Sequence, residues 1–213
     1  MKTITHLTFV ILSFYSINIY SCKDTSDILE SHQQTLKRLE INEISSIAYF
    51  LFKKASEGKL SREMSSYFLD NINLIPLFKK ISDKAEKLSK SICEISDHKP
   101  RRRDDEVDAV RHFIWATYMS LIFGEKVATE IQSLQENKNQ LDKTVLMDLY
   151  NNNLGNIFAP SLYRYKFLRY SKMEAIIDKE IESEVKKLLK KDEFFILETQ
   201  KSKCQSIRLS SHI

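Results

Sequence analysis

Residues 104–123 read DDEVDAVRHFIWATYMSLIF and are followed by Gly124. Acidic residues gather at the start of this stretch, where the helix dipole favours negative charge, and a glycine after the last apolar residue is a common helix stop. The stretch therefore predicts one helix from about Asp104 to Phe123. Asp108, His112, Trp115 and Met119 share one side of it at helical spacing. Because this stripe is half apolar, we expect its polar members at the margin of the core.

Three further helices are expected downstream of this one. Apolar spacing predicts helices over Glu125–Leu134 and Leu141–Leu154, with Gly155 as the residue just past the end of the second. The sequence Ser-Lys-Met-Glu from Ser171 has the form of a capping box and predicts a last helix to about Lys191. Phe194–Leu197 is expected to form one more apolar turn or a short strand.

The upstream part of the chain repeats the same helical periodicity. An amphipathic helix is expected over Ile28–Ala55, a shorter one over Ser61–Leu69, and a third from Pro76 to Ile95, before a loop over residues 97–103. The chain is 42% hydrophobic, which excludes wholesale disorder, and its 3 Gly and 3 Pro disfavour turn-rich β architectures. We therefore expect an all-α fold, an irregular bundle of about seven or eight helices.

The first residues have the form of an export signal. Lys2 precedes an uncharged stretch whose most apolar part, Leu7–Ile19, fits a signal-peptide core of about 7–15 residues and is short for a membrane span of about 20. Ser21-Cys22 at its end resembles the cleavage site of bacterial lipoproteins, although Ile19 and Tyr20 match only looser forms of that motif. We expect cleavage after Ser21, lipidation (palmitate included) of Cys22, and a membrane-anchored protein of the bacterial cell envelope. Ordinary secretion and an uncleaved anchor are the alternatives.

The charge of the chain indicates which partners to expect, and its cysteines raise the question of a disulfide. The whole chain has a net charge of +4, and removal of Lys2 with the signal peptide would leave +3. The mature chain is therefore nearly neutral for its length, and no nucleic-acid partner is expected. The short basic run over residues 101–103 fits a solvated loop or contact with anionic lipid better. The membrane, reached through the N-terminal lipid, is therefore the expected partner. Outside the cytosol Cys93 and Cys204 could form a disulfide; we favour two free thiols, one of them in a loose tail.

Acidic, basic, imidazole and amide side chains are concentrated between Asp104 and Gly155. Residues three and four apart on a helix are neighbours, so Asp108 lies one turn from His112, and Asp148 lies one turn from Asn152. A carboxylate beside an imidazole fixes its tautomer and raises its basicity. The candidate site residues are Asp108, Arg111, His112, Glu136, Asp148, Asn151 and Asn152.

Two blocks of this region resemble an uncharacterised domain found in secreted, surface and toxin-like bacterial proteins. They are Asp108-Ala-Val-Arg-His-x-x-Trp115 and Met147-Asp-Leu-x-Asn-Asn-x-x-Gly155, and the resemblance covers about Asp105 to Gly155. It implies a site at these residues and assigns no reaction. Two family histidines are absent, because Gln135 and Tyr150 stand in their places.

These departures bear on metal binding. Glutamine and tyrosine are poor zinc ligands, so zinc is disfavoured. A hard divalent cation such as Ca²⁺ or Mg²⁺ needs only oxygen ligands and remains a possible cofactor. Its candidate ligands are the side-chain oxygens of Asp108, Glu136, Asp148 and Asn152. For a metal of any other kind, the candidate ligands are Asp108, His112, Glu136 and Asp148.

Two functions compete for this site. In the first, a hydrolase-like domain uses His112 as general base with Asp108 orienting it, while Arg111 stabilises negative charge and Glu136, Asp148 and Asn152 position a substrate or cation. The substrate would be cell-wall or lipid material of the envelope. In the second, the same residues form a structural hydrogen-bond network in a non-catalytic binding or scaffolding lipoprotein. A toxin-like effector is a third possibility, disfavoured by the anchor.

The expected organisation follows from these assignments. It comprises a signal peptide (1–21), a lipidated Cys22 with a tether (22–26), an N-terminal helical part (27–96), a helical domain with the polar site (104–158), C-terminal helices (159–198) and a flexible tail (199–213).

Overall fold

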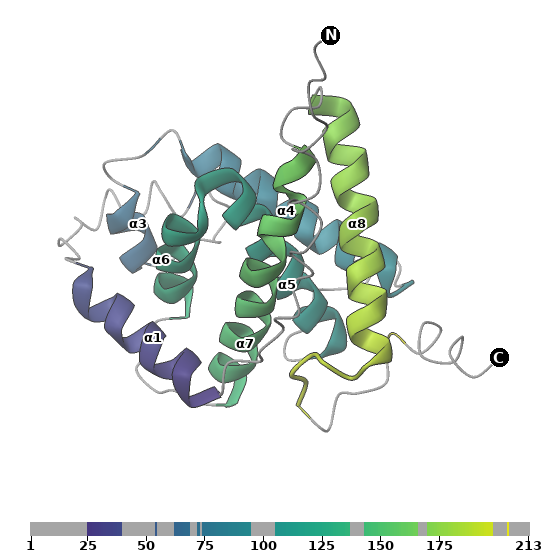
Figure 1. Cartoon of the computed structure of the whole chain (residues 1–213). Helices are drawn as coiled ribbons and strands as arrows, with labels where there is room; N and C mark the ends of the chain where they lie inside the picture. The colour runs from purple at the N-terminus through teal and green to yellow at the C-terminus, as the bar shows by residue number, and fades with distance from the viewer. Residues whose placement is uncertain are drawn as a thin grey trace, which may run out of the picture.

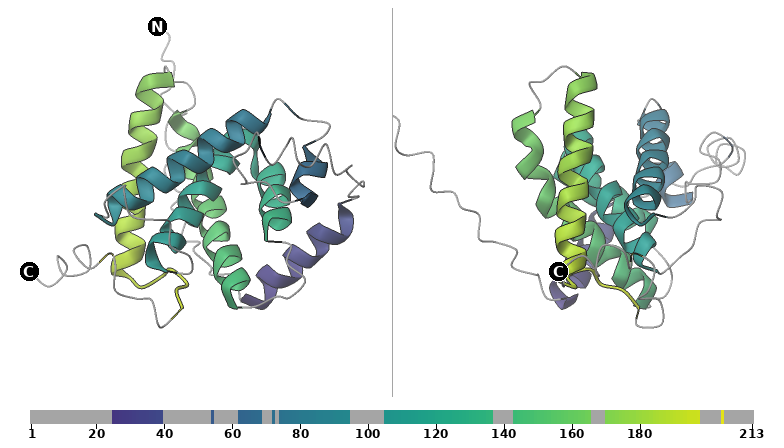
Figure 2. Two further views of the ribbon diagram at one scale, coloured as in Figure 1. Left: turned by 180° about the vertical axis from the view of Figure 1, so that it is seen from behind. Right: turned by 90° about the vertical axis from the view of Figure 1, so that its right-hand side faces the viewer.

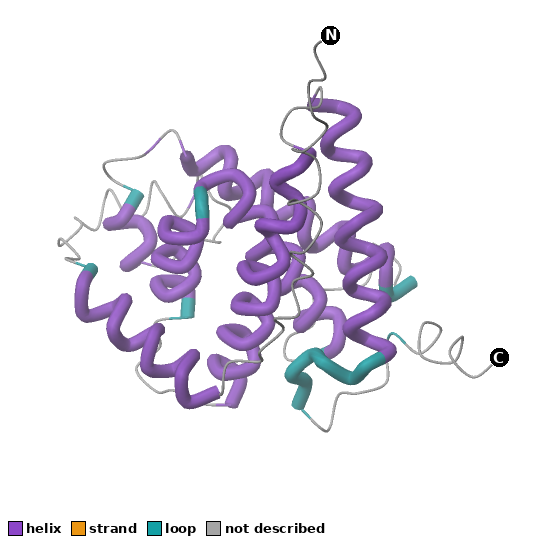
Figure 3. The backbone as a smooth tube through the Cα atoms, viewed as in Figure 1, coloured by secondary structure: helices purple, strands orange, loops and turns teal. Residues whose placement is uncertain are grey.

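The structure is a computed structural model that describes residues 25–39, 54, 62–68, 72, 74–94, 105–136, 143–165, 170–197 and 204. This part of the chain consists of helices and short connections, with no strand among its residues (Figure 3). The predicted all-α fold is therefore confirmed. The helices are α1 (Thr25–Arg38), α3 (Arg62–Tyr67), α4 (Ile75–Ile92), α5 (Glu106–Phe123), α6 (Glu125–Gln135), α7 (Lys143–Phe158), the 3-10 helix η2 (Ala159–Tyr165) and α8 (Tyr170–Lys190).

Helix α5 is the centre of the bundle, and α4, α6, α7 and η2 all pack against it (Figure 1). It is buried on every side, which requires the nearly continuous apolar sequence that it carries after its first turn. Phe113 shows this arrangement, because its ring contacts Phe158 from α7 and Phe194 from the segment after α8. The stretch that predicted the central helix therefore supplies most of the core.

The outer helices cover this centre from opposite sides (Figures 1 and 2). Helix α1 packs on α6 and α7, where Ile28, Val145 and Leu149 form a small separate apolar cluster. Helix α8 packs on α4 and η2. None of the described helices is long and apolar enough to cross a membrane.

Helix boundaries follow the sequence closely around α5. Asp105 caps its N-terminus by accepting a hydrogen bond from the Asp108 backbone N–H (3.0 Å), and Gly124 ends it with a positive φ of 84°. The predicted helices at Glu125–Leu134 and Ser171–Lys191 correspond to α6 and α8. Several expected features lie outside the described residues: the signal peptide, the lipidation site Cys22, the loop at 97–103 and most of the Ile28–Ala55 helix beyond α1.

The prediction that Gly155 follows the end of a helix is wrong. Helix α7 continues through it to Phe158. A Cβ atom at Gly155 would lie 2.3 Å from the Phe113 carbonyl oxygen and 2.9 Å from the Ala116 Cβ. Glycine is therefore required here by the close approach of α5 to α7, and not by a helix stop.

The expectation of free thiols is also wrong, because Cys93 and Cys204 form a disulfide. Cys204 is fully buried, and its backbone N–H donates to the Glu106 carboxylate (2.7 Å). The position at 204 therefore belongs to the core and not to a loose tail. Phe194–Leu197 is neither a helical turn nor a strand, although Phe194 and Ile196 are buried.

Candidate functional site

The polar site forms where three helices meet. Asp108, Arg111 and His112 come from the first turns of α5, and Asp148 and Asn152 come from α7, which lies alongside it. Glu136 is the residue directly after α6. These six residues are called the His112 cluster below. His112 is only 4% exposed, and the acidic residues around it are buried as well.

The imidazole of His112 is held from both sides. Its Nδ1 lies 3.2 Å from the Asn152 side-chain oxygen, and its Nε2 lies 3.2 Å from an Asp148 carboxyl oxygen. An amide oxygen only accepts hydrogen bonds, so Nδ1 carries the hydrogen and the Nε2 of a neutral ring is a hydrogen-bond acceptor. Asn152 therefore orients the ring. The expected role of Asp108 in doing so is wrong, because its nearest carboxyl oxygen lies 3.9 Å from Nε2.

Asp108 instead pairs with Arg111. The Nε of Arg111 donates to Asp108 Oδ1 at 2.8 Å, and its Nη2 donates to the same oxygen. The Nη2 also lies 2.8 Å from His112 Nε2. Arg111 thus neutralises Asp108 and supplies positive charge directly beside the reactive nitrogen of the ring.

Asp148 and Glu136 form a coupled pair of acids. The pKa of the Asp148 carboxyl is raised to about 9, first by burial and then by the neighbouring Glu136 and Asp108 carboxylates, while Arg111 acts in the opposite direction. A hydrogen bond joins the Asp148 and Glu136 side chains. Such a bond between two carboxyl groups requires that one of them holds a proton. Asp148 is therefore protonated at neutral pH, and this proton lies in the bond to Glu136. The Asp148 oxygen beside His112 Nε2 forms no hydrogen bond within the described part of the chain.

The same geometry suits a cation. Asp108, His112 and Asp148 each offer one ligand atom, and these atoms lie within 4.8 Å of one another. Glu136 adjoins this group through Asp148. A bound divalent cation would displace the proton that Asp148 holds. Its two positive charges would then balance three ionised carboxylates beside one guanidinium and a neutral ring. One nitrogen and several carboxylate oxygens are ligands for several divalent ions.

Other predicted residues have different positions. Asn151 is not part of the His112 cluster, because its amide donates to the Phe195 carbonyl oxygen (2.9 Å) and accepts from the Phe195 N–H (3.2 Å). Tyr150 packs against the Phe195 ring. Trp115 is a core residue that contacts the rings of Phe78 and His112.

Sequence reasoning missed a second buried network beside the site. Asn156 and Gln132 exchange two amide hydrogen bonds of 3.0 and 2.8 Å, and Ser120 donates to Asn156 at 2.7 Å. Asn156 lies one helical turn after Asn152, so continuation of the polar stripe along α7 was the signal that could have found it.

Comparison with known proteins confirms that the chain contains an uncharacterised domain. A family described as a domain of unknown function (DUF6973) matches residues 66–191, more than half of the chain and a region that contains the whole His112 cluster. No curated protein and no solved structure matches the sequence. The chain therefore belongs to the DUF6973 family of domains of unknown function.

Proposed function

We propose that this protein is an exported lipoprotein of the bacterial cell envelope whose DUF6973 domain is hydrolase-like, with His112 as its general base. The geometry of His112 carries the catalytic part of the proposal: Asn152 fixes Nδ1, while Nε2 faces Asp148. The uncharged stretch before Cys22 supports export. The disulfide between Cys93 and Cys204 supports it independently, because such bonds persist in oxidising compartments.

In the proposed chemistry, His112, Arg111 and the pair of Asp148 and Glu136 have separate roles. His112 Nε2 takes a proton from a water molecule, whose oxygen attacks the substrate at the bond to be cleaved. Arg111 stabilises the negative charge that develops, once its guanidinium turns from Asp108 toward the substrate. Asp148, which shares a proton with Glu136, supplies a proton to the leaving group. Cell-wall or lipid material of the envelope is the proposed substrate class.

Two substitutions in the His112 cluster test this assignment. His112→Ala removes the base and is expected to reduce turnover about 10²- to 10⁴-fold. Asp148→Asn keeps the shape and removes the transferable proton, so it is expected to have a similar effect. Hydrolysis of cell-wall fragments and of phospholipids is measured with the mature chain, with helical circular dichroism to confirm folding. Lys186→Gln on the outer face of α8 is the control.

A non-catalytic scaffold is the second candidate, and the deep burial of the cluster favours it. In that case the same variants would alter stability alone. Asp148→Ala would lower the free energy of unfolding by about 1–3 kcal/mol, because it leaves buried groups unpaired. The hydrolase assignment would be contradicted if both His112→Ala and Asp148→Asn hydrolysed any of these substrates at the wild-type rate.

Cation binding can be measured without a substrate. Millimolar Mg²⁺, Ca²⁺, Mn²⁺ or Zn²⁺ is added to the mature chain during thermal unfolding, after treatment with a chelator. A bound ion at 100 times its Kd is expected to stabilise the fold by about 2.7 kcal/mol. Asp148→Asn is expected to lose this effect, whereas Glu182→Gln on α8 keeps it. Equal melting temperatures with and without all four ions would exclude these ions from the cluster.

The proposed anchor has its own test, which is independent of the site. The full chain is expressed in a bacterium, and its membrane fraction and N-terminal peptide are analysed. We expect the wild type in the membrane fraction, with Cys22 as the first residue and carrying acyl chains. Cys22→Ala is expected to leave the membrane fraction or to remain unprocessed. A wild-type N-terminus that starts at Cys22 without acyl chains would contradict lipidation and support ordinary secretion.

A further inference from the structure

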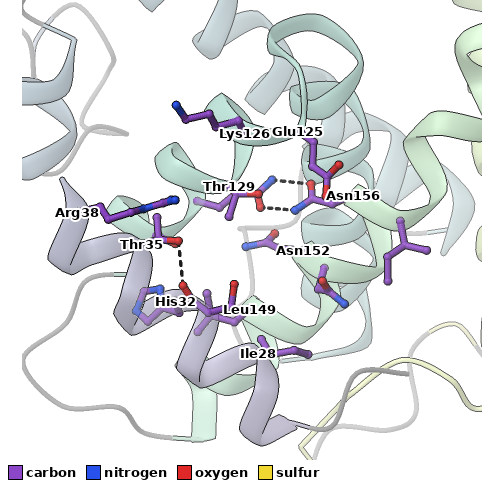
Figure 4. A pocket seen from close by; sticks show the side chains of 15 residues that line it. Ile28, His32, Thr35, Arg38, Glu125, Lys126, Thr129, Leu149, Asn152 and Asn156 are labelled. Carbon is purple, nitrogen blue, oxygen red and sulfur yellow. Dashed lines mark hydrogen bonds between the residues drawn. The ribbon is translucent and has the colours of Figure 1, made fainter. Parts of the chain in front are cut away.

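A polar cavity of about 490 Å³ lies between α1, α6 and α7 (Figure 4). Its volume falls in the range of small-molecule sites, which is about 300–1,000 Å³. Asn152 belongs to its lining, whereas His112 does not. The cavity therefore adjoins the His112 cluster on the side of Nδ1 and is separated from it by the amide of Asn152.

Two buried polar atoms of the cavity lining have no hydrogen-bond partner within the described part of the chain. They are the amide nitrogen of Asn152 on α7 and Nδ1 of His32 on α1. Both side chains are at least nine-tenths buried, and Figure 4 shows the Asn152 nitrogen directed into the space between the helices. An unpaired buried polar group costs about 1–3 kcal/mol, so these two atoms favour a ligand that offers them hydrogen-bond partners.

The charged residues of the lining indicate which kind of ligand the cavity favours. Arg38 from α1 and Lys126 from α6 line the cavity, and neither forms an ion pair with another described residue. Glu125 is the one carboxylate among the lining residues. The described walls thus carry an excess of positive charge, which favours an anionic group in the ligand.

The remaining polar lining suits hydroxyl groups. Thr35 donates its own hydrogen to the Ser31 carbonyl oxygen, so its lone pairs are available as acceptors (Figure 4). Gln132 and Asn156 satisfy each other and form a fixed wall. Burial lowers the pKa of His32, so its ring is neutral at pH 7 and offers one donor and one acceptor.

We propose that this cavity binds a small phosphate ester of a polyol, such as a hexose phosphate or a glycerol phosphate. Arg38 and Lys126 contact the phosphate, and a ligand oxygen accepts a hydrogen bond from the Asn152 amide nitrogen. The opposite end of that amide holds His112 Nδ1, so the ligand stabilises the orientation of the ring. The cavity shares Asn152 with the His112 cluster and does not include His112 itself, so ligand binding can be measured without turnover and without lipidation.

The binding test uses calorimetry with the mature chain. We expect glucose 6-phosphate and glycerol 3-phosphate to bind, inorganic phosphate to bind at least tenfold more weakly, and glucose to show no binding. The double variant Arg38→Gln/Lys126→Gln is expected to weaken binding of the esters about 100-fold. Lys186→Gln removes one exposed positive charge from α8 and is expected to change nothing.

Two further arms locate the source of the phosphate and test the contact with Asn152. Vesicles of phosphatidylglycerol, compared with phosphatidylcholine, report binding of the same chemistry as a lipid headgroup. Ring ¹⁵N shifts of His112 are expected to move when the soluble ester binds, and not in Arg38→Gln/Lys126→Gln at the same concentration. Absence of binding to both esters and to phosphatidylglycerol, or equal binding by wild type and the double variant, would overturn the proposal.

Discussion

Gly155→Ala is expected to destabilise the protein by about 3 kcal/mol, the upper part of the usual range for overpacking. The added Cβ would lie 2.3 Å from the Phe113 carbonyl oxygen, a backbone atom that cannot move without shifting α5. In an exposed helix the same substitution would stabilise by about 1 kcal/mol, because alanine has the higher helix propensity. The sign of the effect therefore reports directly on the approach of α5 to α7.

Urea unfolding followed by circular dichroism measures this change. Asn153 lies on the same helix and is only partly buried, so Asn153→Ala is the matched control. We expect this substitution to leave the free energy of unfolding nearly unchanged. A Gly155→Ala variant as stable as the wild type would mean that α5 and α7 lie further apart. Because both helices carry the His112 cluster, this variant is also expected to disturb the contact between His112 and Asn152.

Loss of the disulfide is the second large effect. The bridge joins residues separated by 111 positions, and in the chain-entropy account a loop of that length stabilises by about 4–5 kcal/mol. The double variant Cys93→Ala/Cys204→Ala is expected to lose about 2–5 kcal/mol, since both sulfur atoms are also buried in the core. The free energy of unfolding, measured with and without reductant, checks this expectation.

The double variant provides the control for the reductant. Reduction should lower the wild-type melting temperature and leave that of Cys93→Ala/Cys204→Ala unchanged. Alkylation followed by peptide mass analysis identifies the state of each thiol. Ready labelling of both cysteines in the folded, unreduced protein would contradict the bridge.

The sequence predicted those features that depend on near neighbours along the chain. The two ends of α5 are indicated by acidic residues in its first turn and by Gly124 after its last residue. The spacing from Asp108 to His112 places both side chains on one side of this helix. The pairing of Asp148 with Asn152 follows the same rule on α7. Once α5 and α7 pack side by side, these stripes meet, and His112 comes to lie beside Asp148 and Asn152.

Features that depend on contacts between distant segments were beyond such reasoning. A glycine at a helix end and a glycine at a helix crossing look alike in sequence, which explains the error at Gly155. The partner of Cys93 lies far along the chain, and no spacing rule connects the two. Asn152 rather than Asp108 orients His112 because the direction of the ring is set by α7, and no local pattern on α5 contains that information.

The attachment of Cys204 has a consequence for the first turn of α5. Its backbone N–H binds the Glu106 side chain, two residues before Asp108, so the covalent link to Cys93 also fastens the opening turn of α5. In a thiol-reducing compartment the disulfide does not persist. The first turn of α5, which bears Asp108, then has no covalent connection through Cys204 to Cys93 at the end of α4. Reduction of the disulfide is therefore expected to loosen the first turn of α5 in addition to lowering the free energy of unfolding.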